Sequence, residues 1–388
     1  MDTNQVNRRN FLRLSVTAGA GLALSPIAAK DIDASKKKMP ERTLGKTNIK
    51  LPILSMGVMR ADNQSIVKAA YNSGIRFFDT ANGYQNGKNE EMLGEFFADK
   101  SRDSFIIATK VKEGIGDDAA QKFLEKFETS MKRLKMDYVD ILYVHALSSA
   151  EEVNYKPILD VMLRLKSEGR AKYLGVSTHS NEPEVIDAMV ENGNYDVVLT
   201  SYNFSQKHLD KLNPSIERAA KAGLGVVAMK TMAGGYLDKE RTQKVNAKAA
   251  LKWALQNPNI HTAIPGYTSF DQLEECLDSA GNLKLTKDEK NFLALASSCT
   301  LLYCNGCKAC IGQCVANLPI PDMMRAYMYN YGYKSPALAK EVISELSVKD
   351  NPCSQCDVCT VKCTSGFMVA DKIKDISRLQ SVPKEFLV

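Results

Sequence analysis

The sequence lacks the features of membrane-spanning and nucleic-acid-binding proteins. It has no apolar run of the roughly 20 residues that a membrane-spanning helix needs, so no stable membrane span is expected. Its formal net charge is only +6 at pH 7, and it has no stripe of basic residues interleaved with aromatic ones. Without such a stripe, no nucleic-acid partner is expected. The composition, 44% hydrophobic and 25% charged residues, is that of an ordinary globular protein.

The first 29 residues are predicted to be a removable export signal. Positions 8–13 read RRNFLR, and residues 14–29 carry no charge. This run is too short, and too interrupted by glycine and proline, to span a membrane, while Ala28 and Ala29 offer small side chains for cleavage. The paired arginines resemble a twin-arginine signal, which implies recognition by the twin-arginine export machinery, transport of the folded protein and a periplasmic location. A basic amphipathic terminus or an uncleaved anchor is the alternative.

The chain after the signal is long enough for two domains. Residues 30–41 are predicted to be a polar linker, and residues 42–295 to form a (β/α)8 TIM barrel. Short apolar runs alternate there with longer amphipathic segments, such as the expected helices 63–72, 119–134 and 246–256. The eight expected strands are 53–56, 77–79, 105–110, 141–145, 173–177, 197–201, 225–230 and 262–266. Eight such units over about 250 residues is the size of this barrel. A doubly wound sheet is the alternative, but no Gly-x-Gly-x-x-Gly turn follows the first strand.

Ionisable side chains lie at the ends of three neighbouring strands. Asp79 ends the second strand with Tyr84 on the loop beyond it, Lys110 ends the third and His145 ends the fourth. The carboxyl ends of barrel strands open onto one mouth, so we expect these four groups to converge. A lysine lowers the pKa of an adjacent tyrosine, an aspartate keeps that lysine charged, and a neutral histidine can orient a carbonyl. The four groups together suit a general acid acting on a carbonyl oxygen, with hydride supplied by a cofactor.

The same region resembles the aldo/keto reductases in the order and spacing of six segments. These are RTLGKTNIKLPILSMG at 42–57, FFDTANGY at 77–84, IIATK at 106–110, ILYVH at 141–145, LGVSTHS at 174–180 and IPGYTSFDQLEE at 264–275. The resemblance implies that Asp79, Tyr84, Lys110 and His145 are a catalytic tetrad with Tyr84 as the acid/base. It also implies that NADP(H) or NAD(H) exchanges hydride with a small carbonyl or alcohol substrate.

The resemblance also assigns cofactor-binding residues, with departures from the family's pattern. The residues assigned are Ser177, Thr178, Met229 and Glu275. Ser177 matches the residue that bonds the nicotinamide carboxamide, whereas Thr178 replaces an Asn and Leu199 a Gln. Met229 stands where many relatives stack a tyrosine on the nicotinamide. Gln272 replaces an Arg that pairs with the 2′-phosphate, which removes a bidentate contact.

Eight of the ten cysteines form two sets with the spacing C-x2-C-x2-C-x3-C. The sets are Cys304, Cys307, Cys310 and Cys314, and Cys353, Cys356, Cys359 and Cys363. In bacterial ferredoxins this spacing places three thiolates on one 4Fe-4S cluster and the fourth on the other. The two sets therefore predict two 4Fe-4S clusters with crossed ligation. Zinc or a disulfide framework is the alternative, although zinc normally uses paired Cys-x2-Cys hooks or Cys with His.

Residues 296–388 are predicted to form a small, mostly α-helical iron-sulfur domain, because residues 322–346 between the two cysteine sets have helical patterning. This resembles the helical ferredoxin modules of multi-subunit dehydrogenases. The sequence therefore predicts an exported oxidoreductase that couples to a redox partner protein or uses its clusters for stability. The rival hypothesis is an iron-sulfur electron-transfer or redox-sensing protein, in which the barrel is a binding module without carbonyl reductase turnover.

Overall fold

The computed structural model describes residues 39–238, 242–298, 302–346, 348–354, 356 and 358–387. The predicted export signal and most of the linker lie outside these residues. Within the described ranges, no helix has both the length and the apolar character to cross a membrane. Contacts join the chain from Met39 onward into one unit.

The centre of the fold is a sheet of eight parallel strands in which each strand pairs with the next one along the chain. The strands are β3 (Met56–Gly57), β4 (Phe77–Asp79), β5 (Ile106–Val111), β6 (Val139–Val144), β7 (Ala171–Thr178), β8 (Val197–Ser201), β9 (Gly225–Met229) and β10 (Thr262–Ala263). The first and last edges meet, because Ser55 N donates to Ala263 O at 2.8 Å and Ala263 N to Ile53 O at 2.9 Å. This sequential order confirms the predicted barrel and contradicts the doubly wound alternative, in which the strand order reverses.

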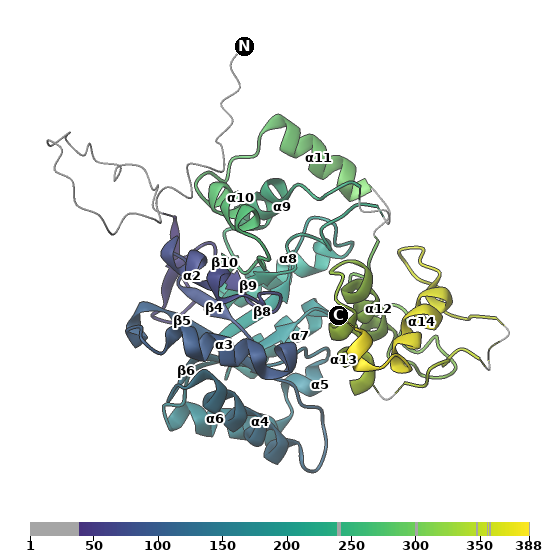
Figure 1. Cartoon of the computed structure of the whole chain (residues 1–388), viewed down its shortest axis with the longest axis horizontal. Coiled ribbons are helices and arrows are strands. Elements are labelled where there is room, and N and C mark those ends of the chain that lie inside the picture. Colours follow the sequence, from purple (N-terminus) through teal and green to yellow (C-terminus); the bar gives the residue numbers. More distant parts are fainter. Residues whose placement is uncertain are drawn as a thin grey trace, which may run out of the picture. The chain divides into compact units, whose positions relative to one another are not determined.

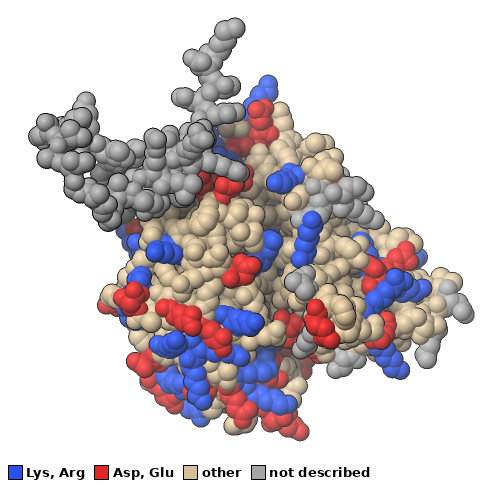
Figure 2. Space-filling model, in the orientation of Figure 1, with Lys and Arg blue, Asp and Glu red and all other residues tan. Residues whose placement is uncertain are grey.

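Helices surround the barrel (Figure 1). They are α2 (Gln64–Asn72), α3 (Lys88–Phe97), α4 (Ala119–Leu134), α5 (Ala150–Val153), α6 (Lys156–Ser167), α7 (Glu182–Asn192), α8 (Leu209–Lys221), α9 (Ala247–Gln256), α10 (Phe270–Ala280) and α11 (Lys287–Ser298). Helix α4 shows why they form, since Phe123, Phe127, Met131 and Leu134 recur every three or four residues and are buried on one face. On the face shown in Figure 2, basic and acidic side chains are intermixed, most densely over α4 and α6.

The core has two layers. One lies between the strands and the helices, and the other fills the barrel with side chains such as Phe77, Tyr143 and Leu199. A hairpin of β1 (Glu41–Thr43) and β2 (Lys50–Pro52) closes the end of the barrel opposite the strands' carboxyl ends. Its turn holds Gly45 at φ +56°, where a Cβ atom would lie 2.3 Å from the nitrogen of Gly225. Only glycine fits this close approach of two backbones.

The described parts of the chain beyond the barrel contain three α-helices separated by irregular segments. These helices are α12 (Ile320–Tyr331), α13 (Pro336–Glu345) and α14 (Val369–Ser377), and short 3-10 turns follow at Arg378–Gln380 and Lys384–Phe386. Two further 3-10 turns, at Tyr84–Gly87 and Arg102–Ser104, lie within the barrel. The helical pattern expected over 322–346 is divided into α12 and α13, because the chain turns between Gly332 and Pro336. The chain beyond the barrel contacts the barrel at Gly306. The carbonyl of Gly306 accepts hydrogen bonds from Asn181 N and Ser180 Oγ, both at 3.2 Å.

We predict that Gly94→Ala destabilises the barrel. Helix α3 packs so closely on α4 at this point that a Cβ atom on Gly94 would lie 2.3 Å from Arg133 O. Overpacking of this kind costs about 1–3 kcal/mol. The matched control is Gly114→Ala, since a Cβ atom there would meet nothing within 4 Å. Thermal unfolding should show a lower midpoint for Gly94→Ala alone; equal midpoints would contradict the close packing.

Candidate active site

The four side chains predicted to converge meet at the carboxyl ends of the strands. Lys110 Nζ donates to Asp79 Oδ1 at 2.5 Å and to Thr80 O at 2.6 Å, and lies 3.3 Å from Tyr84 Oη. The ring of His145 stands edge-on to that of Tyr84, with 5.8 Å between the centroids. Asp79 and Lys110 are almost fully buried, at 2% and 1% exposure. The structure therefore brings the predicted tetrad together.

Hydrogen bonds fix the loop that carries Tyr84. Thr80 Oγ1 donates to Asn89 Oδ1 at 2.7 Å, and Asn82 Nδ2 donates to Ser130 Oγ at 3.0 Å. Gln85 Nε2 donates to Ala61 O at 3.1 Å. These bonds tie the loop to α3, to α4 and to the loop after β3. The phenol is thereby held in place before any substrate arrives, which is what proton transfer at a defined atom requires.

Burial controls the protonation state of Tyr84. Burial raises the pKa of its hydroxyl well above the usual value, and the negative charge of Asp79 adds to the rise. The neighbouring Lys110 was expected to lower this pKa, but the pKa is raised overall. The lysine is paired with Asp79, and the penalty for a buried phenolate is the larger effect. Tyr84 therefore keeps its proton at neutral pH and is available as an acid.

His145 is neutral, as expected. Burial lowers its pKa well below 6.5, and the positive charge of Lys110 lowers it further. A neutral imidazole beside the Tyr84 phenol can hydrogen-bond a carbonyl oxygen without adding a charge to the site.

The tetrad opens into a cavity of about 380 Å³ with walls from both halves of the chain. Tyr84 and His145 lie on the barrel side. Helices α12 and α13 supply the opposite wall with Arg325, Tyr329 and Glu341. Sequence reasoning missed these residues, because nothing in the local pattern of a helix near a cysteine set indicates that it covers a distant strand end.

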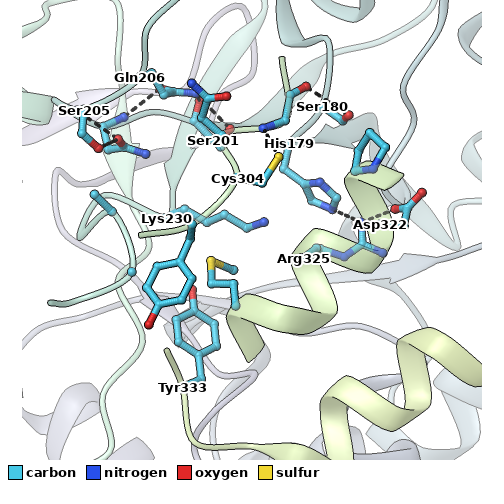
Figure 3. Close-up of a pocket in the computed structure, with 18 residues that line it drawn as sticks. His179, Ser180, Ser201, Ser205, Gln206, Lys230, Cys304, Asp322, Arg325 and Tyr333 are labelled. Atoms are coloured by element: carbon cyan, nitrogen blue, oxygen red, sulfur yellow. Dashed lines mark hydrogen bonds and ion pairs between the residues drawn. The ribbon is translucent and has the colours of Figure 1, made fainter. Parts of the chain in front are cut away.

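A second cavity lies beside the first and shares His179 and Arg325 with it. In Figure 3, Lys230 extends into this space, and Arg325 reaches from α12 to His179, whose Nε2 lies 3.1 Å from Arg325 Nη1. Burial, together with the nearby charge of Arg325, lowers the pKa of Lys230 to about 7. Lys230 ends a predicted strand just as Lys110 and His145 do, so the same strand-end reasoning could have found it.

The residues assigned to the cofactor are only partly gathered. Ser177 lies at the end of β7, where its Oγ accepts a hydrogen bond from Ala146 N at 2.8 Å, and half-buried Met229 ends β9. Thr178 Oγ1 is bonded to Ser180 O at 3.1 Å. Glu275 lies on α10 and lines neither cavity. Leu199 packs into the apolar barrel interior, so no amide stands at its position.

Comparison with known proteins agrees with this geometry. The model of the aldo/keto reductase family matches residues 49–250. The chain belongs to the aldo/keto reductase family. It is thus an oxidoreductase of a family that uses NAD(P)H as hydride carrier.

Its similarity to individual proteins covers mainly the barrel. It is 26% identical over 291 residues to an uncharacterized oxidoreductase, YqkF, of Bacillus subtilis. That similarity covers 66% of this chain and 94% of YqkF. It is 28% identical over 284 residues to L-galactose dehydrogenase of Arabidopsis thaliana, spanning 61% and 87%. The solved aldo-keto reductase AKR11C1 from Bacillus halodurans (holo form) has the same fold, with a TM-score of 0.57 and 21% identity over 69% of this chain and 99% of that one.

Cysteines of the two sets lie near one another in space. Cys304 is close enough to Cys307, Cys310 and Cys363 for their charges to affect its pKa. A cavity of about 70 Å³ is lined by Cys353, Cys356 and Cys359 together with Cys314. Among the described residues, no three or more His, Cys, Asp or Glu side chains gather as they would around a single metal ion.

We predict that His145 makes the fold acid-sensitive. The folded chain keeps this residue neutral, whereas the unfolded chain gains its proton below about pH 6.5. The unfolded state thus binds more protons at low pH, and stability falls as the pH falls, by up to about 2 kcal/mol between pH 7 and pH 5 for one histidine. Urea unfolding at both pH values should show a smaller decline for His145→Gln. An unchanged decline would contradict the burial of a neutral histidine.

Proposed function

We propose that the barrel interconverts a small carbonyl compound and its alcohol by hydride transfer, with Tyr84 as the general acid/base. The observation that carries this proposal is the position of the Tyr84 hydroxyl, 3.3 Å from the buried Lys110 Nζ and beside a cavity that also holds His145. The raised pKa of Tyr84 supports its role as an acid.

The tetrad residues have distinct tasks in reduction. Neutral His145 and Tyr84 both hydrogen-bond the carbonyl oxygen and so fix its position in the cavity. Tyr84 gives its proton to that oxygen as negative charge develops on it. Lys110 then stabilises the phenolate that remains, and Asp79 holds Lys110 through the 2.5 Å contact. Alcohol oxidation uses the same groups in reverse.

The mouth of the barrel fits a nicotinamide in part. A bound NADPH or NADH would supply the hydride. Ser177 Oγ accepts one hydrogen bond, and within the described chain no hydrogen bond from its hydroxyl is seen, so it retains a donor for a carboxamide. Met229 offers an apolar surface at the neighbouring edge of the mouth. Gln272 bonds to Thr268 N at 2.9 Å within its own turn, so it does not replace the missing guanidinium for a 2′-phosphate.

We propose that the two cysteine groups hold two 4Fe-4S clusters with crossed ligation. One cluster would be held by Cys304, Cys307, Cys310 and Cys363, and the other by Cys314, Cys353, Cys356 and Cys359. The support is the cavity bordered by all four thiols of the second group. Such clusters carry single electrons whereas hydride carries two, so we propose that they are structural or serve a redox partner protein rather than relaying electrons directly from the nicotinamide.

Export in the folded state is part of the same proposal. The RRNFLR segment supports recognition by the twin-arginine machinery and a periplasmic destination. That route accepts folded proteins, so clusters and nicotinamide bound in the cytoplasm could travel with the enzyme.

A second candidate is an electron-transfer or redox-sensing protein that performs no carbonyl reduction. It is favoured by one observation, the apolar Leu199 packed where the family pattern has an amide for the nicotinamide. In that case the four tetrad residues would be present but would not catalyse carbonyl reduction.

We predict that Tyr84→Phe lowers kcat for small aldehydes by about 10²- to 10⁴-fold, because it removes the proton donor and leaves the ring. The matched control is Tyr138→Phe, whose hydroxyl accepts a bond from Lys172 Nζ at 3.1 Å. Anaerobic assays that follow NADPH absorbance decide between the two candidates. If wild type and Tyr84→Phe are equally inactive while the clusters still cycle, the second candidate holds.

We predict that paired substitutions reveal the crossed ligation. The double variant Cys304→Ala with Cys363→Ala should lose one cluster and keep about four irons, because both residues belong to one group. The double variant Cys304→Ala with Cys314→Ala should lose both clusters. Iron and sulfide analysis of anaerobically purified protein measures this, with Cys276→Ala as the control. The opposite result would indicate sequential ligation, and zinc in place of iron would overturn the cluster proposal.

A further inference from the structure

Two basic side chains lie close together on the wall of the second cavity. Lys230 and Arg325 line the same space, and the charge of Arg325 acts directly on Lys230. Like charges repel, most strongly where water is limited. Burial and the charge of Arg325 disfavour the charged form of Lys230, and a bound anion would favour it again.

The nearby acids are already engaged. Asp322 Oδ1 pairs with Arg325 Nη1 at 2.7 Å. Glu182 is fully buried, and its carboxylate accepts from Ser201 Oγ and from Gln206 Nε2 at 3.2 Å, with His208 Nε2 at 3.0 Å. In the described part of the chain, Lys230 Nζ makes no hydrogen bond or ion pair.

Donors remain on both cations and around them. The contacts of Arg325 within the described residues use Nη1 only, which leaves Nε and Nη2. Asn305 Nδ2 is buried in the lining of the same cavity and has no partner among the described residues. These donors would satisfy an oxyanion.

The backbone at Lys230 supports a functional reason for its position. It follows β9 at φ +57°, in the left-handed region that a residue with a Cβ atom adopts only at a cost. Strain of this kind is kept where the placement of the side chain matters. In Figure 3 that placement aims the amine into the cavity rather than toward solvent.

We propose that Lys230 and Arg325 form an oxyanion subsite that takes the carboxylate of a small carbonyl substrate, an oxo acid or aldehyde acid. The inference rests on the proposed carbonyl chemistry. Arg325 lines both cavities and its charge reaches Tyr84 and His145, so an anion bound to it lies within one small molecule's length of the tetrad. Anchoring the carboxylate orients the carbonyl toward Tyr84.

A phosphate of the dinucleotide presents the same chemistry, since Lys230 directly follows Met229. The two sources differ in what they predict. A substrate carboxylate makes recognition depend on the charge of the carbonyl compound, whereas a cofactor phosphate makes it depend on the dinucleotide.

The test titrates the anaerobic holoprotein, with NADP+ present, with pyruvate and with 4-oxobutanoate, each beside its neutral amide, by calorimetry. We expect each acid to bind more tightly than its amide, and Lys230→Met and Arg325→Met to weaken the acids by about 10- to 100-fold while sparing the amides. Lys230→Arg and Arg325→Lys keep the charge and should lose less. Lys248→Met, on α9 beside Asp278, controls for net charge.

Three of the remaining outcomes overturn the proposal. Equal binding of acids and amides by wild type removes the subsite. If the two Met variants bind NADPH more weakly than wild type does but bind the acids equally well, the anion held by Lys230 and Arg325 is a phosphate of the cofactor. A shifted cluster reduction potential with unchanged acid binding assigns the cations to the Cys304 cluster. Turnover measurements separate the subsite from the proposed function. Acid binding that needs Lys230 and Arg325 but gives no Tyr84-dependent turnover keeps the subsite and rejects the carbonyl reductase. Tyr84-dependent turnover without a preference for acids rejects the subsite and keeps the reductase.

Discussion

The buried pair of Asp79 and Lys110 is the interaction on which the active site depends. Each charge alone would be costly at 2% and 1% exposure, so each requires the other. A buried ion pair contributes little net stability, and its value here is position. Strands β4 and β5 are adjacent in parallel register, which sets the carboxylate and the ammonium side by side beneath Tyr84. The barrel therefore holds the Lys110 ammonium next to the Tyr84 hydroxyl.

The cysteine-rich part of the chain completes this site instead of standing apart from it. Its segment around Gly306 bonds to the loop after β7, and α12 and α13 supply one wall of the tetrad cavity. Gly306 has φ +74°, and a Cβ atom there would lie 2.3 Å from His179 O, so the contact requires glycine. Both halves of the chain consequently form the wall of the tetrad cavity, and Arg325 links the cysteine-rich part to it.

Local physics made much of the fold predictable. Helix 119–134 was expected and observed with the same bounds, because its apolar spacing is regular. The strand-end rule located Asp79, Tyr84, Lys110 and His145, since parallel strands of a barrel share one mouth. Strand lengths were less accurate. The expected first strand, 53–56, is regular only at Met56–Gly57, with Leu54 bridging to Ala263, because closure of the barrel determines which residues pair.

The sequence by itself determined the barrel, the identity of the tetrad and the spacing of the cysteines, because each follows from patterns within a few residues or from a repeated unit. Only the tertiary structure decided what surrounds them. The direction of the Tyr84 pKa depends on burial by segments far along the chain, and Arg325 meets the tetrad only because α12 folds back over the barrel mouth. The meeting of Lys230 with Arg325 likewise depends on that docking. Burial and proximity between distant segments leave no local signature, so no reading of the residues alone could supply them.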